Sequence, residues 1–211
     1  MTEESPIVYV VDDDPSVRRS LSRLIRSAGF RVETFAQAQD FLDQKENLDP
    51  NCLVLDVNLP GLSGLDLQKE LSSKGYVMPI VFITGYGTIP MTVQAMKGGA
   101  VEFLEKPVDH QVLLNAIRQA IKKDRQMKQQ FNEINEIRQR LATLTPREKE
   151  VLPLVVSGML NKQIAFKLGT TEKTIKVHRS RIMEKMRADS LADLVRLAQK
   201  GGIDFQKSQL L

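Results

Sequence analysis

Three consecutive aspartates, Asp12, Asp13 and Asp14, end the first apolar run of this 211-residue chain, in the stretch IVYVVDDD. Two carboxylates about 5 Å apart repel by roughly 3 kcal/mol at an effective dielectric constant of about 20. Such a cluster needs a positive group beside it, or its side chains must turn into water. The polar residues that end or follow later apolar runs are Asp56, Thr84 and Lys106.

If the ends of these runs meet, Asp12, Asp13 and Asp56 form a cluster of carboxylates. A hard divalent cation, Mg²⁺ or another such as Mn²⁺, takes oxygen ligands and would relieve their repulsion. It would also neutralise an incoming phosphoryl group, for which an aspartate is a known acceptor. Lys106 would supply a second positive charge and Thr84 a hydroxyl for a phosphoryl oxygen, so the residue types point to phosphoryl transfer.

An alternation of short apolar runs with helix-like segments would position these residues. The apolar runs cover residues 7–11, 31–35, 52–55, 80–83 and 101–104. The helix-like segments cover residues 16–28, 36–46, 64–73, 90–98 and 109–121. This α/β pattern predicts a doubly wound, five-stranded parallel sheet with helices on both faces. Ligands of such sheets bind at the carboxyl ends of the strands, where the polar residues above lie.

Charge is distributed unevenly along the chain. Residues 1–121 carry 11 Lys/Arg and 16 Asp/Glu, a balance of −5, whereas residues 122–211 carry 19 and 10, a balance of +9. The asymmetry suggests two units, the second with a polyanionic partner. No apolar run is long enough for a membrane span, the N-terminal stretch lacks the basic start of a secretory signal, and the single cysteine, Cys52, cannot form an internal disulfide. We therefore expect a cytoplasmic protein without membrane association.

Residues 122–143 contain neither Gly nor Pro and predict a helix that continues from 109–121 and links the two units. An apolar stripe with spacings of three or four residues runs along it. Two interpretations stay open, since the stripe could pack against the protein's own domains or form the seam of a dimer. The residues of the stripe are Met127, Phe131, Ile134, Ile137, Leu141 and Leu144.

The remaining part of the chain, residues 144–211, predicts a small all-α domain. Two of its helices are joined by a turn containing Gly169, and the second begins near Glu172 with a short basic outer face. Such a helix fits the major groove of DNA, with cations on phosphates and Val177 near a thymine methyl group. The residues expected to contact double-stranded promoter DNA are Lys173, Thr174, Lys176, Val177, Ser180 and Arg181.

Four stretches in the first half, VVDDD, CLVLDVNLPGLSG, VFITGYG and EFLEKPV, resemble the motifs of bacterial two-component receiver domains, and the resemblance covers residues 6–121. It implies that Asp56 is phosphorylated by a sensor histidine kinase. It also implies that Asp12 and Asp13 hold the metal ion, with Asp13 and Asp56 as direct ligands and the backbone carbonyl of Asn58 completing the set.

The same resemblance assigns Thr84 as the switch hydroxyl, Phe103 as the switch aromatic and Lys106 as a contact of the phosphoryl group. Asn58 stands where the nearest relatives are expected to have arginine, which bears on the lifetime of the phosphoryl-aspartate. Asp14 falls outside the metal-binding pair, and we interpret it as a solvated residue before Pro15.

The stretch TIKVHRSRIMEKMRADSLADLV, within residues 144–200, resembles the recognition region of LuxR-type helix-turn-helix domains. Together the two resemblances imply a response regulator of the FixJ type, with a receiver domain (1–121), a linker helix (122–143) and a DNA-binding domain (144–211). Phosphorylation would promote a homodimer that binds promoter DNA and acts on RNA polymerase. Such a protein is not a turnover enzyme, although it can lose its phosphoryl group slowly.

Two alternatives remain open from the residues. VVDDDPSV also fits the Asp-x-Asp pattern of haloacid-dehalogenase phosphatases, with Asp12 as nucleophile and Asp14 as acid/base. That family does not require Asp56 and its motif. The second alternative is a transcription factor whose first domain binds a small effector and is not controlled by phosphorylation, which the acidic pocket disfavours.

Overall fold

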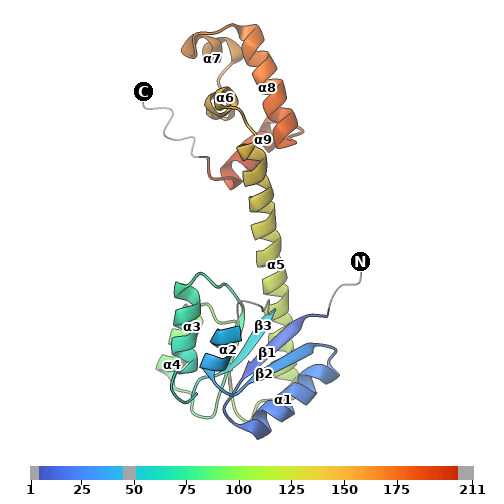
Figure 1. Ribbon diagram of the computed structural model, residues 1–211, viewed down its shortest axis with the longest axis vertical. Coiled ribbons are helices and arrows are strands. Elements are labelled where there is room, and N and C mark those ends of the chain that lie inside the picture. The colour runs from blue at the N-terminus through green and yellow to red at the C-terminus, as the bar shows by residue number, and fades with distance from the viewer. Residues whose placement is uncertain (1–4, 45–50, 204–211) are drawn as a thin grey trace. The chain divides into compact units, whose positions relative to one another are not determined.

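The computed structural model describes residues 5–44 and 51–203 (Figure 1). The chain divides into two compact units, Met1–Met127 and Lys128–Leu211, and each is described by itself. In this described part, no helix is long and apolar enough to cross a membrane.

The first unit is built on a five-stranded sheet with the strand order β2-β1-β3-β4-β5, in which every pairing is parallel. The order reverses between β1 and β3, so the sheet is doubly wound, as predicted. The central strands β1 and β4 consist almost entirely of β-branched and aromatic residues, which suit a pleated surface buried on both sides. The strands are β1 (Ile7–Val11), β2 (Arg31–Phe35), β3 (Cys52–Asp56), β4 (Ile80–Thr84) and β5 (Glu102–Glu105).

Helices cover both faces of this sheet. The helices are α1 (Pro15–Ser27), α2 (Ala38–Gln44), α3 (Gly64–Ser73), α4 (Ile89–Lys97) and α5 (His110–Ala142). Helices α1 and α5 share one apolar core with the sheet, and α2, α3 and α4 share the other. The predicted segments agree with these bounds to within two residues, except that residues 45–46 of the segment 36–46 lie outside the described residues.

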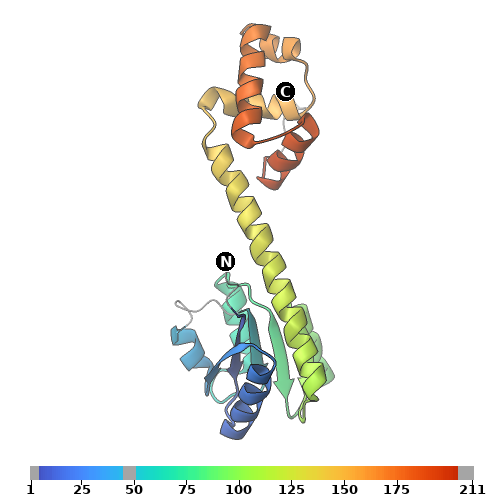
Figure 2. The same cartoon turned by 90° about the vertical axis from the view of Figure 1, so that its right-hand side faces the viewer.

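Helix α5 is continuous over 33 residues (Figure 2), as the absence of Gly and Pro predicted. The residues of its apolar stripe differ in burial along the helix. Ile137 is buried in the core of the second unit together with Leu144, and Leu141 packs against the same core. Phe131, in contrast, is 63% exposed. Of the two interpretations of the stripe, packing on the protein's own domain therefore holds for these three residues.

The second unit continues with four short helices. They are α6 (Pro146–Val156), α7 (Asn161–Lys167), α8 (Glu172–Met186) and α9 (Leu191–Lys200). Helix α6 begins with a reciprocal capping box, in which the Thr145 hydroxyl accepts from the Glu148 N–H and the Glu148 carboxylate accepts from the Thr145 N–H. The turn between α7 and α8 contains Gly169 at a φ of +60°, a left-handed conformation that glycine adopts without strain.

Candidate functional site

The carboxyl ends of β1 and β3 bring the predicted acidic residues together. Asp56 is the last residue of β3, and Asp12 directly follows β1. Ligand oxygens of Asp12, Asp13 and Asp56 all lie within 4.8 Å of one another. Asp12 and Asp56 are buried, with exposed fractions of 0% and 4%, whereas Asp13 is exposed. The cluster therefore has one solvent-facing carboxylate and two in the protein interior.

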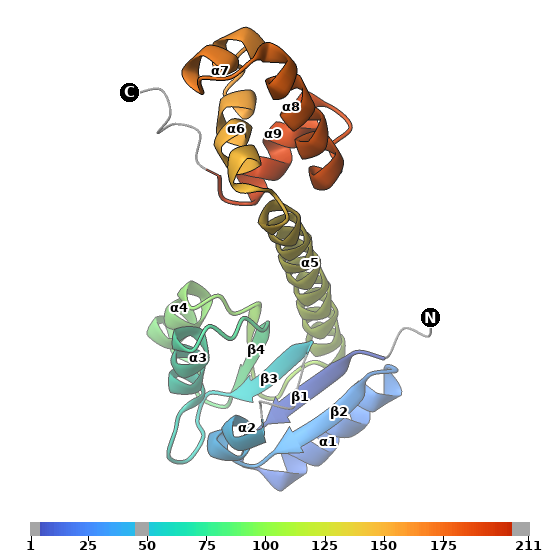
Figure 3. The same cartoon turned by 45° about the horizontal axis from the view of Figure 1, so that its top comes forward.

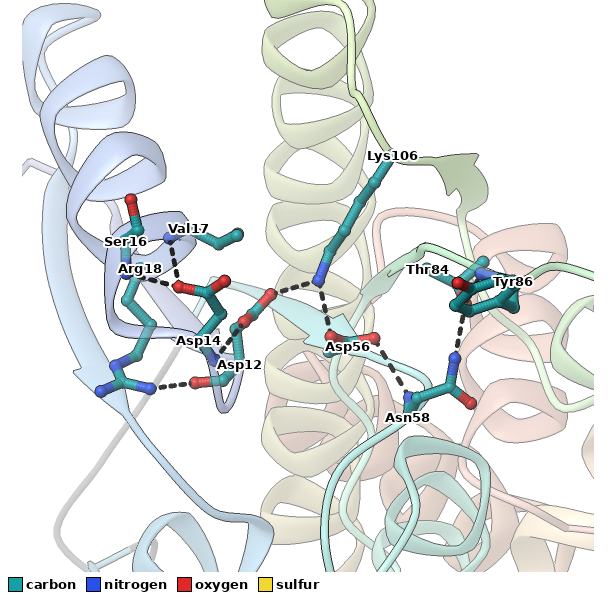
Figure 4. Close-up of polar contacts among 10 residues, drawn as sticks. All are labelled: Asp12, Asp14, Ser16, Val17, Arg18, Asp56, Asn58, Thr84, Tyr86 and Lys106. Atoms are coloured by element: carbon teal, nitrogen blue, oxygen red, sulfur yellow. Dashed lines mark hydrogen bonds and ion pairs between the residues drawn. The ribbon is translucent and has the colours of Figure 1, made fainter.

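Lys106 supplies the positive charge that this cluster requires (Figure 4). Its Nζ lies 2.7 Å from Asp12 Oδ2 and 2.6 Å from Asp56 Oδ2, so one ammonium group bridges both buried carboxylates. The backbone places it there, because the Lys106 N–H donates to the carbonyl of Thr84 at the end of β4. The next peptide bond, to Pro107, is cis. The positive charge of Lys106 thus offsets the repulsion between the carboxylates that the sequence predicted.

Burial and ion pairing have opposite effects on the pKa values of Asp12 and Lys106. Burial raises the pKa of the Asp12 carboxyl, and the hydrogen bonds from Lys106 and from the Asp14 N–H only partly offset it. Burial alone would lower the pKa of Lys106, but its hydrogen bonds to Asp12 and Asp56 outweigh burial, and the pKa is raised. Lys106 therefore keeps its proton and its charge at neutral pH.

Thr84 is fully buried at the end of β4, and its hydroxyl is held in place by two donors (Figure 4). Its Oγ1 accepts from Asn58 Nδ2 at 3.1 Å and from the Tyr86 N–H at 3.2 Å. The Asn58 N–H also donates to Asp56 Oδ1 at 3.1 Å. Asn58 thus touches both Asp56 and Thr84. The sequence analysis assigned a role only to the backbone carbonyl of Asn58, as a metal ligand. The one indication that its side chain matters was that asparagine stands where arginine is expected.

Phe103, on β5, is half-buried and packs beside the loop that follows Thr84. Its ring centroid lies 6.1 Å from that of Phe82. A Cβ atom on Gly87 would lie 3.1 Å from Phe103 Cε1 and 3.2 Å from Thr84 Cγ2. The absence of a side chain at Gly87 therefore lets this loop approach Phe103 and Thr84 closely, so the predicted switch pair has a common neighbour.

Asp14 does not point into the acidic cluster. It is exposed, and its Oδ1 accepts from the backbone N–H groups of Ser16, at 2.7 Å, and Val17, at 3.3 Å, so it is the N-cap of α1. These hydrogen bonds lower the pKa of Asp14. The sequence predicted a solvated residue here but not the cap. It also missed Arg18, whose guanidinium donates to the Asp12 carbonyl (Figure 4).

The second candidate site is α8, which presents one apolar and one polar face. Thr171 caps the helix by accepting from the Thr174 N–H. The inward side chains are Ile175, Ile182 and Met186. The exposed side chains include Lys173, Lys176, Val177, Ser180 and Arg181. Thr174 differs from these five, since it is half-buried and its hydroxyl lies 2.8 Å from that of Thr171. The structure therefore brings five of the six predicted DNA contacts onto one exposed face.

Polar contacts fix α8 against its neighbours. Lys185 Nζ lies 2.7 Å from the buried carboxylate of Glu148, which belongs to the α6 capping box. Burial would raise the pKa of Glu148, but the hydrogen bonds from Lys185 and Thr145 outweigh it and lower the pKa. Arg179 donates to Asn161 at the start of α7 at 3.1 Å. His178 is half-buried, and among the described residues its Nδ1 has no hydrogen-bond partner.

The fold and the two sites define a class of protein. A doubly wound parallel sheet with clustered carboxylates, a bridging lysine and a buried threonine at its carboxyl edge defines a receiver domain. Helices α7 and α8, joined by a glycine turn and presenting a basic face, form a helix-turn-helix.

Comparison with known proteins gives the family. Residues 8–118 match the response regulator receiver domain, and residues 142–198 match the luxR family of bacterial regulatory proteins. The chain therefore belongs to the response regulators, as a transcriptional regulator of two-component systems that combines a receiver with a LuxR-type DNA-binding domain. This confirms the resemblance to regulators of the FixJ type.

Individual relatives support the family assignment over nearly the whole chain. Nodulation protein W of Bradyrhizobium diazoefficiens is 50% identical over 203 residues, which cover 96% of this chain and 89% of that protein. Transcriptional regulatory protein FixJ of Azorhizobium caulinodans is 42% identical over 200 residues, 95% of each chain. The solved structure of response regulator StyR has a TM-score of 0.84 at 49% identity and covers 93% of this chain and 100% of that one.

The two alternatives drawn from the sequence lose their support. The family models that match are a response regulator receiver domain and a luxR-family domain, and FixJ of Azorhizobium caulinodans is similar over 95% of this chain. The phosphatase hypothesis needs Asp14 as an acid/base beside Asp12, whereas Asp14 is held at the start of α1 as its N-cap.

Proposed function

We propose that Asp56 accepts a phosphoryl group from a sensor histidine kinase and that its phosphorylation controls transcription. The observation that carries the proposal is the position of its carboxylate, buried at the end of β3, clustered with Asp12 and Asp13 and 2.6 Å from Lys106 Nζ. In the transfer, an Asp56 oxygen forms a bond to phosphorus while the P–N bond to the donor histidine breaks. The electron pair of that bond stays on the imidazole nitrogen.

A divalent cation, Mg²⁺ or Mn²⁺, fits the same cluster. Its direct ligands would be Asp13, Asp56 and the backbone carbonyl of Asn58, and Asp12 would help to hold it. The donor set consists of oxygens and includes three carboxylates within 4.8 Å of one another, which is the chemistry that these hard ions prefer. When bound, the ion would offset negative charge on the phosphoryl oxygens.

Lys106 and Thr84 would bind the oxygens of the phosphoryl group. Lys106 keeps its proton and can stabilise a phosphoryl oxygen at Asp56. The Thr84 hydroxyl accepts hydrogen bonds from Asn58 and Tyr86, and no described residue accepts its own hydrogen. It can therefore donate to a phosphoryl oxygen without first losing a partner for its proton. The contact from Asn58 would hold the hydroxyl within reach.

Movement of Thr84 toward the phosphoryl group would be transmitted through the residues packed beside it. Phe103 could then turn inward and reshape the surface of α4, β5 and α5. We propose that this surface, which includes Met91, Val101 and residues 109–121, forms a homodimer after phosphorylation. Exposed apolar residues on α4 support this assignment, since Ile89 is 82% and Val93 45% exposed.

A dimer would present two copies of α8 to the two half-sites of a promoter. The proposed contacts with double-stranded DNA are Lys173, Thr174, Lys176, Val177, Ser180 and Arg181. We assign residues 1–121 to the receiver, 122–143 to the linker helix and 144–211 to the DNA-binding domain. We further propose that the protein acts in the cytoplasm, that the bound dimer acts on RNA polymerase, and that the only reaction of the receiver besides phosphoryl acceptance is slow self-dephosphorylation.

Incubation with a small phosphodonor and Mg²⁺, followed by intact-mass measurement, tests the phosphoryl acceptor. We expect a single phosphoryl addition that Asp56→Asn abolishes, and Asp13→Ala should remove both the dependence on the cation and the activity. Asp14→Asn is the matched control, because asparagine still caps α1 and the residue lies outside the cluster. A label on Asp12 instead of Asp56 would contradict the proposal.

Sedimentation with and without a phosphoryl mimic tests the dimer. We expect association of the chain together with a gain in DNA affinity. The competing explanation is that phosphorylation frees a basic domain from an acidic one, since residues 1–121 carry −5 and residues 122–211 carry +9. A monomer that gains full DNA affinity would rule out dimerisation as the switch.

A further inference from the structure

Helix α1 lies beside the edge strand β2 (Figure 3). A groove lined by residues of both elements gathers arginines on a domain that is otherwise acidic. Its volume is about 480 Å³. The side chains that matter for its chemistry are Arg18, Arg19, Arg23, Arg26, Ser22 and Thr34, and no carboxylate lines it. Helix α1 contains four arginines and no acidic residue, whereas residues 1–121 together carry a balance of −5.

In the described part of the protein, none of these arginines forms an ion pair with a carboxylate, although the charge of Arg18 acts on nearby Asp14. Arg18 donates to the carbonyl of Asp12, and Arg26 donates to the carbonyl of Val32 at 3.2 Å, so both are bound to uncharged groups. Arg19 and Arg23 are exposed, and in residues 5–44 and 51–203 neither has a carboxylate partner. Four like charges around one groove favour an anion as their counter-charge.

We propose that this groove binds a small anion carrying two or more phosphate groups. Guanidinium groups match phosphate oxygens in a bidentate manner, and the hydroxyls of Ser22 and Thr34 could add neutral donors. No aromatic side chain lines the groove, so the ligand would be recognised through its phosphates and not by stacking of a base. The groove is separate from the carboxylate cluster at Asp56, and this inference goes beyond the proposed function.

The surroundings favour a small anion over a nucleic acid. A ligand that fits the groove would experience mainly the four nearby arginines, because salt screens charges more than about 8 Å away at physiological ionic strength. An extended polyanion would also meet the acidic remainder of the domain. Asp40 and Asp43 lie close by, since they line the adjoining groove on the other side of β2, which shares Arg26 and Thr34.

Calorimetric titration of the full chain with inorganic tripolyphosphate, without divalent cations, tests this proposal. Because the C-terminal unit is basic too, paired variants have to locate the binding. We expect Arg19→Gln with Arg23→Gln to weaken binding at least tenfold, whereas Lys173→Gln with Lys176→Gln leaves this site intact. Arg19→Lys with Arg23→Lys keeps the charge but loses the bidentate geometry, and should weaken binding to an intermediate extent.

The groove variant must still take up one phosphoryl group at Asp56, which shows that the receiver is folded. Unchanged tripolyphosphate affinity in the folded groove variant, or loss of binding only in the α8 variant, would overturn the proposal. Titration with a nonspecific DNA duplex distinguishes the source of the phosphates. We expect equal affinity and salt dependence in the groove variant and the unaltered chain, and a reduced salt slope in the groove variant would overturn the assignment to a small anion.

Discussion

Gly64, the first residue of α3, packs directly against the end of the strand that carries Asp56. A Cβ atom at this position would lie 2.2 Å from the Asp56 backbone oxygen and 3.0 Å from its carbonyl carbon. Since real Cβ atoms essentially never approach other atoms closer than 3.0 Å, Gly64→Ala requires a backbone displacement of about 1 Å. No side-chain rotation can relieve the clash, because the atoms it meets belong to the backbone.

We expect Gly64→Ala to lower the free energy of unfolding by about 2 kcal/mol, within the range for overpacked sites. For a unit of this size, that corresponds to a fall in Tm of roughly 8 °C. A displacement of about 1 Å at the reacting group can reduce a rate about 100-fold. Phosphorylation of Asp56 by a small phosphodonor should therefore slow by a similar factor.

The assay combines thermal unfolding followed by circular dichroism with intact-mass measurement of phosphoryl uptake over time. Gly85→Ala is the matched control for stability, because a Cβ atom there would have no atom within 4 Å and its φ is not positive. It should change the free energy of unfolding by less than about 0.5 kcal/mol. If Gly64→Ala retained the Tm and a phosphorylation rate within twofold of the unaltered chain, the close packing of α3 on Asp56 would be refuted.

Three further predictions concern charged and DNA-facing residues. Lys106→Met leaves the buried Asp12 and Asp56 carboxylates without their shared cation, so in the absence of divalent ions denaturant titration should show a loss of roughly 3 kcal/mol; no loss would contradict the bridging role. Lys185 and Thr145 lower the pKa of Glu148 from its ordinary value of 4.5, so the ionised carboxylate stabilises the fold above that pH and this contribution disappears as the pH falls below it. Glu148→Gln should therefore flatten the pH dependence of the free energy of unfolding in this acidic range. An unchanged pH profile in the variant would contradict this role of Glu148. Lys176→Ala should weaken DNA binding and reduce the salt slope by about one unit, whereas substitution of Val177 should alter base preference more than salt slope; if neither changes binding, the DNA-reading face lies elsewhere.

Much of the fold could be predicted because local patterns and global architecture agree. The apolar runs coincide with the strands, and the parallel arrangement follows from their alternation with helices. The convergence of Asp12, Asp13 and Asp56 also followed, since the carboxyl ends of neighbouring parallel strands lie at one edge. Lys106 could be expected beside them because the cluster required a positive charge.

Other features depended on side-chain directions that sequence spacing does not determine. The contact of Asn58 with Thr84 joins residues 26 positions apart and depends on the conformation of the loop that follows β3. The apolar stripe of α5 has uniform spacing, yet Ile137 is buried and Phe131 is exposed, because only the end of the helix meets the second core. The arginine groove could not be predicted from spacing alone, because it depends on side chains of α1 lying next to Thr34 of β2.

The central claim is that phosphorylation of Asp56 raises the affinity of the α8 face for DNA. The most direct test incubates the full chain with a small phosphodonor and Mg²⁺, then measures intact mass and binding to a promoter duplex on the same samples. We predict that DNA affinity rises in proportion to the singly phosphorylated fraction and that Asp56→Asn shows neither change. Full phosphorylation at Asp56 without any change in DNA affinity would contradict it.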